Sequence, residues 1–135
     1  MSLGRVLVVD DEPDLRKAVR LVLVKAGYDV VESENGEQAI AVINAADNAQ
    51  AIDTIICDIY MPKMNGMEAI THFRTHFPSI PVIVLTGQTD RHWADSLFKQ
   101  GVSDYLVKPV DPENLRAVVQ KTTRERILFK GLSKK

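Results

Sequence analysis

Four apolar segments of this chain each end on side chains that could handle a phosphoryl group. The segments are residues 6–9, 55–57, 82–85 and 105–107, and the residues that follow them are Asp10 with Asp11, Asp58, Thr86, and Lys108. If these segments are parallel strands, their carboxyl ends meet at the edge of the sheet where open α/β sheets bind ligands. That edge would then combine carboxylates with a hydroxyl and an ammonium group.

Carboxylates that converge on one small site repel one another and raise one another's proton affinity unless a cation neutralises them. Mg²⁺ suits such a site, because it prefers oxygen ligands and commonly combines one or two protein carboxylates with phosphate oxygens. We therefore expect Asp11 and Asp58 to bind Mg²⁺ (or Mn²⁺) directly, and Asp10 to bind it directly or through water.

The same residues are suited to phosphoryl transfer. An aspartate carboxylate can act as a covalent nucleophile and form an acyl phosphate, and an ionised carboxylate needs no separate base. With Asp58 as the acceptor, the metal would bridge Asp58 and one phosphoryl oxygen, and Lys108 would balance a second. The Thr86 hydroxyl and the Gly87 amide would bind the third, since glycine adds no side-chain bulk there.

The elements that must position these residues alternate between strands and helices. We expect strands near 5–10, 29–32, 53–57, 81–85 and 103–107, and helices near 13–26, 36–46, 66–76, 91–100 and from 112 toward 126. This alternation indicates βα units and a parallel sheet covered on both faces. With right-handed crossovers, the fold class is α/β, a doubly wound five-stranded parallel sheet of order 2-1-3-4-5, flavodoxin-like, in which strands 1 and 3 are neighbours. No structure is assigned to 47–51.

Length, composition and charge limit the number of domains and the kinds of partner that the chain can have. A chain of 135 residues, 45% hydrophobic, is the size of one domain with a real core. Its net charge of −1 provides no overall field for nucleic acid or membrane. The single cysteine, Cys57, cannot form an intramolecular disulfide and is expected to be a buried thiol. There is no signal peptide and no run near the roughly 20 apolar residues of a membrane span, so we expect a cytoplasmic protein.

Four motifs in order identify a family. They are Val9-Asp10-Asp11-Glu12, the run from Asp58 to Gly66, Leu85-Thr86-Gly87, and the run from Asp104 to Pro109. Together they resemble the CheY-like receiver domain of two-component response regulators, and the resemblance covers about residues 4–125.

The resemblance implies a role for each matched residue. Asp58 would accept the phosphoryl group, and Lys108 would contact it. Asp10 and Asp11 would bind Mg²⁺, with the backbone carbonyl of Tyr60 as a further ligand. Thr86 and Tyr105 would form a switch pair, in which Thr86 moves toward the phosphate and Tyr105 enters the vacated space. The Lys108-Pro109 peptide bond would be a candidate for the cis form, and Gly66 would end the loop after the phosphoacceptor.

The resemblance also implies partners. A histidine kinase or phosphotransfer protein would supply the phosphoryl group, and phosphorylation would change a face made of the helix at 91–100, the strand at 103–107 and the final helix. That face could bind an output domain or a second copy. We expect no membrane contact and no direct nucleic-acid binding. Residues 1–3 are expected to be an N-terminal segment that could derive from cloning, and 126–135 to be a basic tail or the start of a linker.

Two other functions stay open at this point. A receiver-like interaction module that never uses phosphate would not need the complete set of acidic residues and lysine. A metal-dependent phosphatase with an aspartyl nucleophile would typically carry Asp-x-Asp, whereas Asp10 is followed at that spacing by Glu12.

Overall fold

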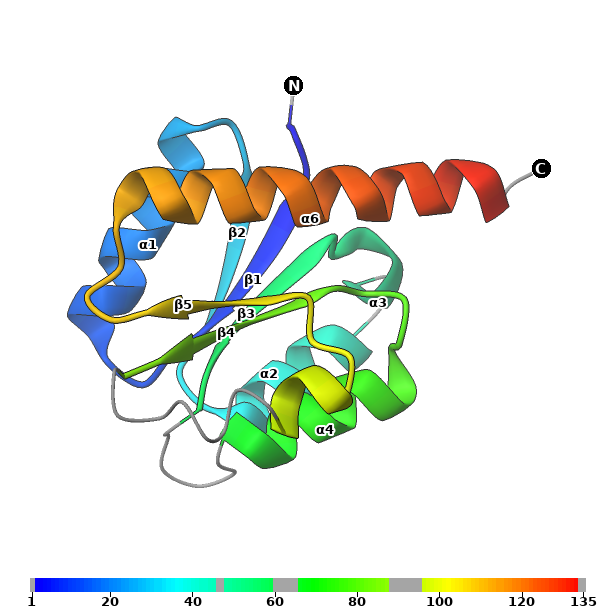
Figure 1. Ribbon diagram of the computed structural model, residues 1–135, viewed down its shortest axis with the longest axis horizontal. Coiled ribbons are helices and arrows are strands. Elements are labelled where there is room, and N and C mark those ends of the chain that lie inside the picture. Colours follow the sequence, from blue (N-terminus) through cyan, green and yellow to red (C-terminus); the bar gives the residue numbers. More distant parts are fainter. Residues whose placement is uncertain (1, 46–47, 60–65, 88–95, 134–135) are drawn as a thin grey trace.

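A five-stranded parallel sheet forms the centre of the molecule (Figure 1). The computed structural model describes residues 2–45, 48–59, 66–87 and 96–133. In the order β2-β1-β3-β4-β5, the strands span Asp29–Ser33, Arg5–Val9, Thr54–Asp58, Val82–Thr86 and Asp104–Val107. The predicted fold class and strand order are therefore confirmed.

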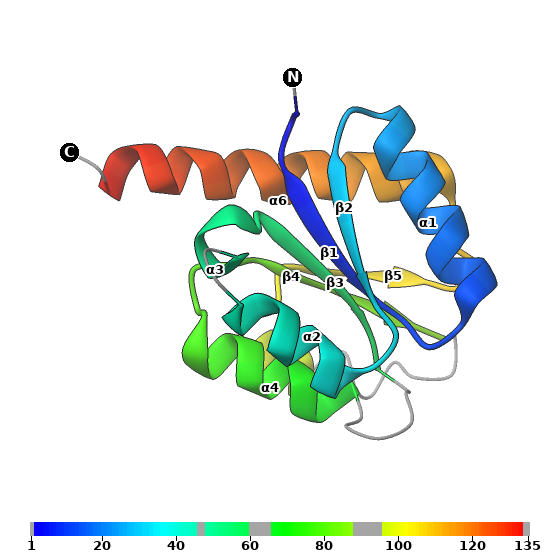
Figure 2. The same cartoon turned by 180° about the vertical axis from the view of Figure 1, so that it is seen from behind.

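Helices cover both faces of the sheet. They are α1 (Pro13–Lys25), α2 (Gly36–Asn44), α3 (Asn48–Ala51), α4 (Gly66–His76), a helical turn at 96–99, and α6 (Pro112–Ser133). The helices α1 and α6 lie on one face, and α2 and α4 lie on the other (Figures 1 and 2). The central strands are consequently shielded from water on both sides, which explains their continuous apolar sequences.

The core has two parts, one on each side of the sheet. Leu7, Ile55 and Phe73 belong to the part under α2 and α4, whereas Val8, Ile56 and Leu115 belong to the part under α1 and α6. Alternate strand residues point to opposite faces, so each central strand contributes to both parts. Cys57 is fully buried in the first part, as expected.

Local signals explain where the helices begin and end. Pro13 occupies the start of α1, where its missing N–H costs no helical hydrogen bond. The side chain of Asn35 caps α2 by accepting a hydrogen bond from the Gln38 amide, at 2.8 Å. Gly27, after α1, has φ of 106°, a backbone conformation that L side chains rarely adopt.

Apart from shifts of one residue at several element ends, the structure differs from the sequence prediction at the end of α2, at α3 and at the end of α6. The helix α2 ends at Asn44 rather than 46, and a short helix, α3, occupies part of the connection for which no structure was predicted. The helix predicted for 91–100 is described only at 96–99, because 91–95 lie outside the described residues. The last helix crosses residue 126 without a break and continues to Ser133.

Candidate functional site

The carboxyl ends of four strands meet at one edge of the sheet. Asp58 and Thr86 are the last residues of β3 and β4, whereas Asp10 directly follows β1 and Lys108 directly follows β5. The Lys108 amide donates to the Thr86 carbonyl at 2.8 Å, which extends the pairing of the two strands by one residue. Because β1 and β3 are neighbours in the sheet, Asp10 and Asp58 come together.

Four acidic side chains form a cluster at this edge. A carboxylate oxygen from each of Asp10, Asp11, Glu12 and Asp58 lies within 4.8 Å of the others. Asp10 is 0% exposed and Asp58 is 3% exposed, whereas Glu12 reaches into solvent. Among the described residues, Oδ2 of Asp10 is buried without a hydrogen-bond partner. A buried carboxylate oxygen in that state is costly unless a cation or water satisfies it.

Lys108 reaches into the acidic cluster from β5. Its Nζ lies 2.8 Å from Oδ2 of Asp58, 3.2 Å from Oε1 of Glu12 and 3.7 Å from Oδ2 of Asp10. The Lys108-Pro109 peptide bond is cis. Lys108 is therefore in direct contact with Asp58, the expected phosphoacceptor.

The cluster shifts the proton affinities of its members. The pKa of Asp10 is raised to about 6, mainly because the carboxyl group is buried. The hydrogen bond that Asp10 accepts from the Glu12 amide, at 2.8 Å, lowers this pKa, and the negative charge of Asp58 raises it. Partial burial lowers the pKa of Lys108. The hydrogen bond to Asp58, the negative charges of Asp58 and Asp10, and the hydrogen bond to Glu12 raise it, and the net shift is upward. Lys108 is accordingly charged at neutral pH.

The cluster has the features of a site for a hard divalent cation. All of its donors are carboxylate oxygens, the kind of ligand that Mg²⁺ prefers. Oδ2 of Asp10, which is buried without a hydrogen bond among the described residues, is available as a ligand atom. The expected further ligand, the Tyr60 carbonyl, lies outside the described residues.

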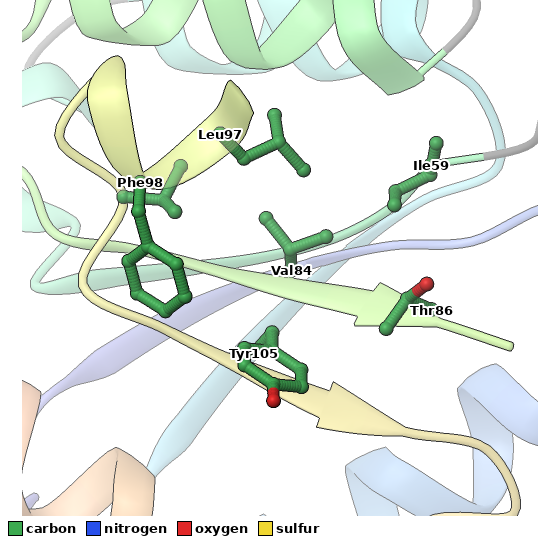
Figure 3. A pocket seen from close by; sticks show the side chains of 7 residues that line it. Ile59, Val84, Thr86, Leu97, Phe98 and Tyr105 are labelled. Atoms are coloured by element: carbon green, nitrogen blue, oxygen red, sulfur yellow. The ribbon is translucent and has the colours of Figure 1, made fainter. Parts of the chain in front are cut away.

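A small apolar pocket lies beside the site, between one face of β4 and β5 and the helical turn at 96–99 (Figure 3). Thr86 and Tyr105 both line it, together with Val84, Leu97 and Phe98. The Thr86 hydroxyl donates to the Gly87 carbonyl at 3.2 Å. The Tyr105 ring is 38% exposed and packs edge to face on Phe98, with ring centres 5.7 Å apart. The two residues of the expected switch pair thus share one pocket.

Comparison with known proteins identifies the family. The profile of the response regulator receiver domain matches residues 6–120. The chain belongs to this family. Receiver domains of this kind are phosphorylation-activated signalling domains of two-component systems, they typically use Mg²⁺, and histidine kinases are their partners.

Individual relatives agree with this assignment. The chain is 36% identical over 112 residues to the transcriptional regulatory protein GlrR of Escherichia coli, covering 83% of this chain and 24% of the relative. It is 30% identical over 122 residues to a cyclic di-GMP phosphodiesterase of Thermotoga maritima, covering 90% and 32%. The chain therefore spans between a quarter and a third of these relatives' length.

A solved structure agrees as well. The chemotaxis protein CheY4 of Vibrio cholerae is 32% identical to this chain and superposes with a TM-score of 0.79, covering 88% of this chain and 98% of CheY4. The receiver domain described here thus corresponds to nearly the whole of that protein. None of the helices in the described part of the chain has the length and apolarity needed to cross a membrane.

Two side chains contribute to the receiver site beyond those expected from sequence. Nη1 of Arg16 donates to the Asp10 carbonyl at 2.7 Å and its Nε to Glu32 at 3.0 Å, so it ties the acidic segment to β2. Glu12, to which no role at the site was assigned from the sequence, pairs with Lys108. Both residues lie within six positions of Asp10, which was the available signal, but charged residues near a helix start are usually solvated.

Gly66, the first residue of α4, packs against the backbone of Asp58 and Ile59. Its amide donates to the Ile59 carbonyl at 2.8 Å. A Cβ at this position would collide with the Asp58 carbonyl and would lie 2.5 Å from the Ile59 Cα. The close approach of α4 to the backbone of the phosphoacceptor strand therefore requires glycine.

Proposed function

We propose that Asp58 is the phosphoacceptor of this receiver domain and that the acidic cluster binds Mg²⁺ for the reaction. The observation that carries the proposal is the contact of Lys108 with Asp58 at 2.8 Å, beside a buried Asp10 oxygen that has no hydrogen-bond partner among the described residues. Together they place the Asp58 carboxylate between a cationic group and a buried carboxylate oxygen suited to a metal ion.

The proposed reaction is an in-line transfer from a phosphohistidine. An oxygen of Asp58 forms a bond to phosphorus as the bond from phosphorus to the histidine nitrogen breaks, and that nitrogen takes up a proton as it leaves. Bound Mg²⁺ would neutralise charge on Asp58 and on one phosphoryl oxygen. Asp10 and Asp11 would hold the ion, with the Tyr60 carbonyl as a further ligand, and the ionised Asp58 needs no base.

The remaining residues would hold the product. Lys108, already charged and in contact with Asp58, would pair with a second phosphoryl oxygen. The Thr86 hydroxyl would turn from the Gly87 carbonyl toward the third oxygen, where the Gly87 amide also donates. Small phosphodonors would also form the acyl phosphate at Asp58. The acyl phosphate would hydrolyse slowly, with water accepting the phosphoryl group at the same site.

Phosphorylation would be transmitted through the pocket beside the site. As Thr86 moves toward the phosphate, the Tyr105 ring would turn from its exposed position into the pocket that both residues line. The surface of 96–99, β5 and α6 would then change, and it would bind an output domain or a second copy. We place the receiver domain at 4–125, in the cytoplasm, and assign 126–135 as a basic tail or the start of a linker.

Phosphorylation by a small donor tests this proposal. Acetyl phosphate with Mg²⁺ should add one phosphoryl group to the wild type by intact mass spectrometry, and none when Mg²⁺ is chelated. Asp58→Asn should abolish the addition, whereas Asp29→Asn, a matched change in an exposed aspartate at the start of β2, should leave it intact. Phosphorylation that persists in Asp58→Asn would overturn the assignment.

A further inference from the structure

We propose that this receiver domain has a second anion site, for a small tetrahedral oxyanion such as phosphate, at the edge of the sheet opposite Asp58. An open hollow lies there, lined by residues of the segments that precede β4 and β5 and of the second half of α6. Its lining includes Arg74, Ser79, Gly101, Ser103, Glu125 and Arg126. Two guanidinium groups and two hydroxyl-bearing residues are the donors that bind phosphate.

Arg126 is the strongest part of the argument. The residue is 7% exposed, which is rare for an arginine whose guanidinium bonds to no carboxylate in the described part of the chain. One amino group, Nη1, donates to the hydroxyl and the carbonyl of Ser79, at 2.9 and 3.4 Å. Its Nε is buried without a hydrogen-bond partner among the described residues. A buried cation that is not fully paired is costly, and an anion in the adjoining hollow would compensate its charge.

Asp53, whose charge acts on Arg126, does not fill that role. Its two oxygens accept hydrogen bonds from the Arg5 amide at 3.0 Å and from Lys130 at 2.6 Å. The neutralising carboxylate on that side is thus already engaged with another cation. An oxyanion in the hollow would give Arg126 both a counter-charge and a hydrogen-bond acceptor.

Arg74 provides the second positive charge. It is held at the end of α4 by bonds to the carbonyls of Gln100, Pro78 and Ile80, at 3.2, 2.9 and 3.3 Å. These three contacts fix its orientation, so little side-chain entropy would be lost on binding. Glu125 lines the hollow as well and opposes the two arginines, which leaves a net charge of about +1 to attract an anion.

The location gives the site a consequence for α6. Arg126 lies on α6, whereas Ser79 precedes β4 and Ser103 precedes β5. An anion that contacts all three segments would fasten the second half of α6 to the sheet. Because α6 continues to Ser133, such binding would restrict the direction in which the chain leaves the domain.

An NMR titration of the whole chain tests the proposal. Sodium phosphate, without Mg²⁺ and against sodium chloride of equal ionic strength, should shift the Ser79, Gly101 and Ser103 amides and the Arg126 Nε–H saturably, with one dissociation constant. Sulfate should compete if any tetrahedral oxyanion fits. Asp58→Asn should bind phosphate as the wild type does, so a failure here is separate from a failure of the phosphoacceptor assignment.

Charge variants sharpen the test. Arg74→Gln and Arg126→Gln should each weaken phosphate binding at least tenfold, and Glu125→Gln should tighten it. Arg116→Gln, which removes an exposed positive charge elsewhere on α6, should change it less than twofold. If Arg126→Gln fails to fold, the Arg74 and Glu125 variants still decide. Three outcomes would each overturn the proposed site. They are chemical shift changes no larger than those with chloride, equal weakening of phosphate binding in Arg116→Gln, and an Arg126 Nε–H that contacts water and does not shift with phosphate.

Discussion

Asp10 is deeply buried, and one of its carboxylate oxygens lacks a hydrogen bond among the described residues. It is 0% exposed, yet its Oδ2 has no hydrogen-bond partner among the described residues. Burial and the nearby Asp58 charge together raise its pKa to about 6. Such a group stabilises the domain when a metal is bound and destabilises it otherwise.

Asp10→Asn should therefore remove the stabilisation that Mg²⁺ gives. For the wild type, Mg²⁺ at ten times its dissociation constant should raise the free energy of unfolding by about 1.4 kcal/mol. The variant should gain less than about 0.3 kcal/mol under the same conditions, because one of the two buried carboxylates is lost. Urea unfolding with Mg²⁺ and with chelator measures the difference.

Two outcomes would count against this role of Asp10. One is an equal Mg²⁺ effect in wild type and Asp10→Asn. The other is an equal loss in the control Asp104→Asn, whose aspartate lies at the start of β5 and away from the cluster.

Lys108 competes with the metal for Asp58 and later assists the phosphoryl group. Its Nζ is 2.8 Å from Asp58, and its raised pKa keeps it charged at neutral pH. Lys108→Gln should thus bind Mg²⁺ more tightly, on the order of fivefold, since a positive charge leaves the site. Its phosphorylation by acetyl phosphate should nonetheless be slower, because a developing phosphoryl charge loses its partner.

The opposite signs of these two effects distinguish a specific role from general damage. Mg²⁺ titration by calorimetry and phosphorylation rates by mass spectrometry measure them, with the exposed Lys121→Gln as control. Weaker Mg²⁺ binding in Lys108→Gln would contradict the competition argument.

At the scale of elements, α6 is held to the sheet in two different ways. Its first half packs Leu115 and Val119 into the core. Its second half is held by polar contacts, of which the innermost joins the Thr54 hydroxyl to those of Thr122 and Thr123, both at 3.0 Å. Thr122 also donates to the Val119 carbonyl at 3.2 Å. All three hydroxyls are satisfied if Thr123 donates to Thr54 and Thr54 donates to Thr122.

Thr54→Val should loosen this second half of α6. The substitution conserves shape but leaves two buried threonine hydroxyls short of a partner, which costs about 1–3 kcal/mol. We expect that loss in chemical unfolding and faster amide hydrogen exchange in 122–133 than in 113–119. Thr75→Val, at an exposed position of α4, should change stability by less than about 0.5 kcal/mol. Uniform acceleration along α6 would show that the two halves are not separate.

The edge strand β5 has a different character from the central strands. Tyr105 and Val107 are exposed on it, whereas β3 and β4 are buried throughout. Phe98 extends the exposed apolar surface beside Tyr105. An edge strand with aromatic and aliphatic side chains in solvent is suited to contact with a partner, which agrees with the face expected to respond to phosphate.

At the scale of the whole molecule, the site and that face are joined through β4. Thr86 ends β4 at the site, and Val84 of the same strand pairs with Tyr105 of β5. The pocket that Thr86 and Tyr105 share has a volume of about 10 Å³. That space does not admit an aromatic ring, so Tyr105 can enter only after another lining group moves.

Thr86→Ala should separate phosphorylation from its effect on Tyr105. Asp58 remains, so acetyl phosphate should still label the variant. In the wild type, phosphorylation should lower the rate at which Tyr105, now 38% exposed, is nitrated, whereas in the variant the rate should stay unchanged. Peptide mass spectrometry follows Tyr105 and also buried Tyr28, the internal control. A normal decrease in Thr86→Ala would contradict the proposed coupling.

Much of the fold was predictable because parallel βα units leave strong local patterns. The apolar runs at 55–57 and 82–85 mark strands buried on both faces, and Gly27 and Pro13 mark ends of a helix. The sequence signal failed where patterns are weak. The alanine-rich α3 was not assigned, and α6 was divided at residue 126 because its second half is basic rather than apolar.

The sequence by itself predicted the strand order, the family, and the set of residues at the carboxyl edge. Motif spacing indicates the family and the edge residues, and the alternation of strands and helices with right-handed crossovers indicates the order. Only the tertiary structure decided what depends on contacts between distant segments. It buried Asp10 with an unpartnered oxygen, joined Lys108 to Glu12, and enclosed Arg126 beside Ser79. A side chain's burial and its partners are set by packing across the sheet, and no local pattern in the chain encodes them.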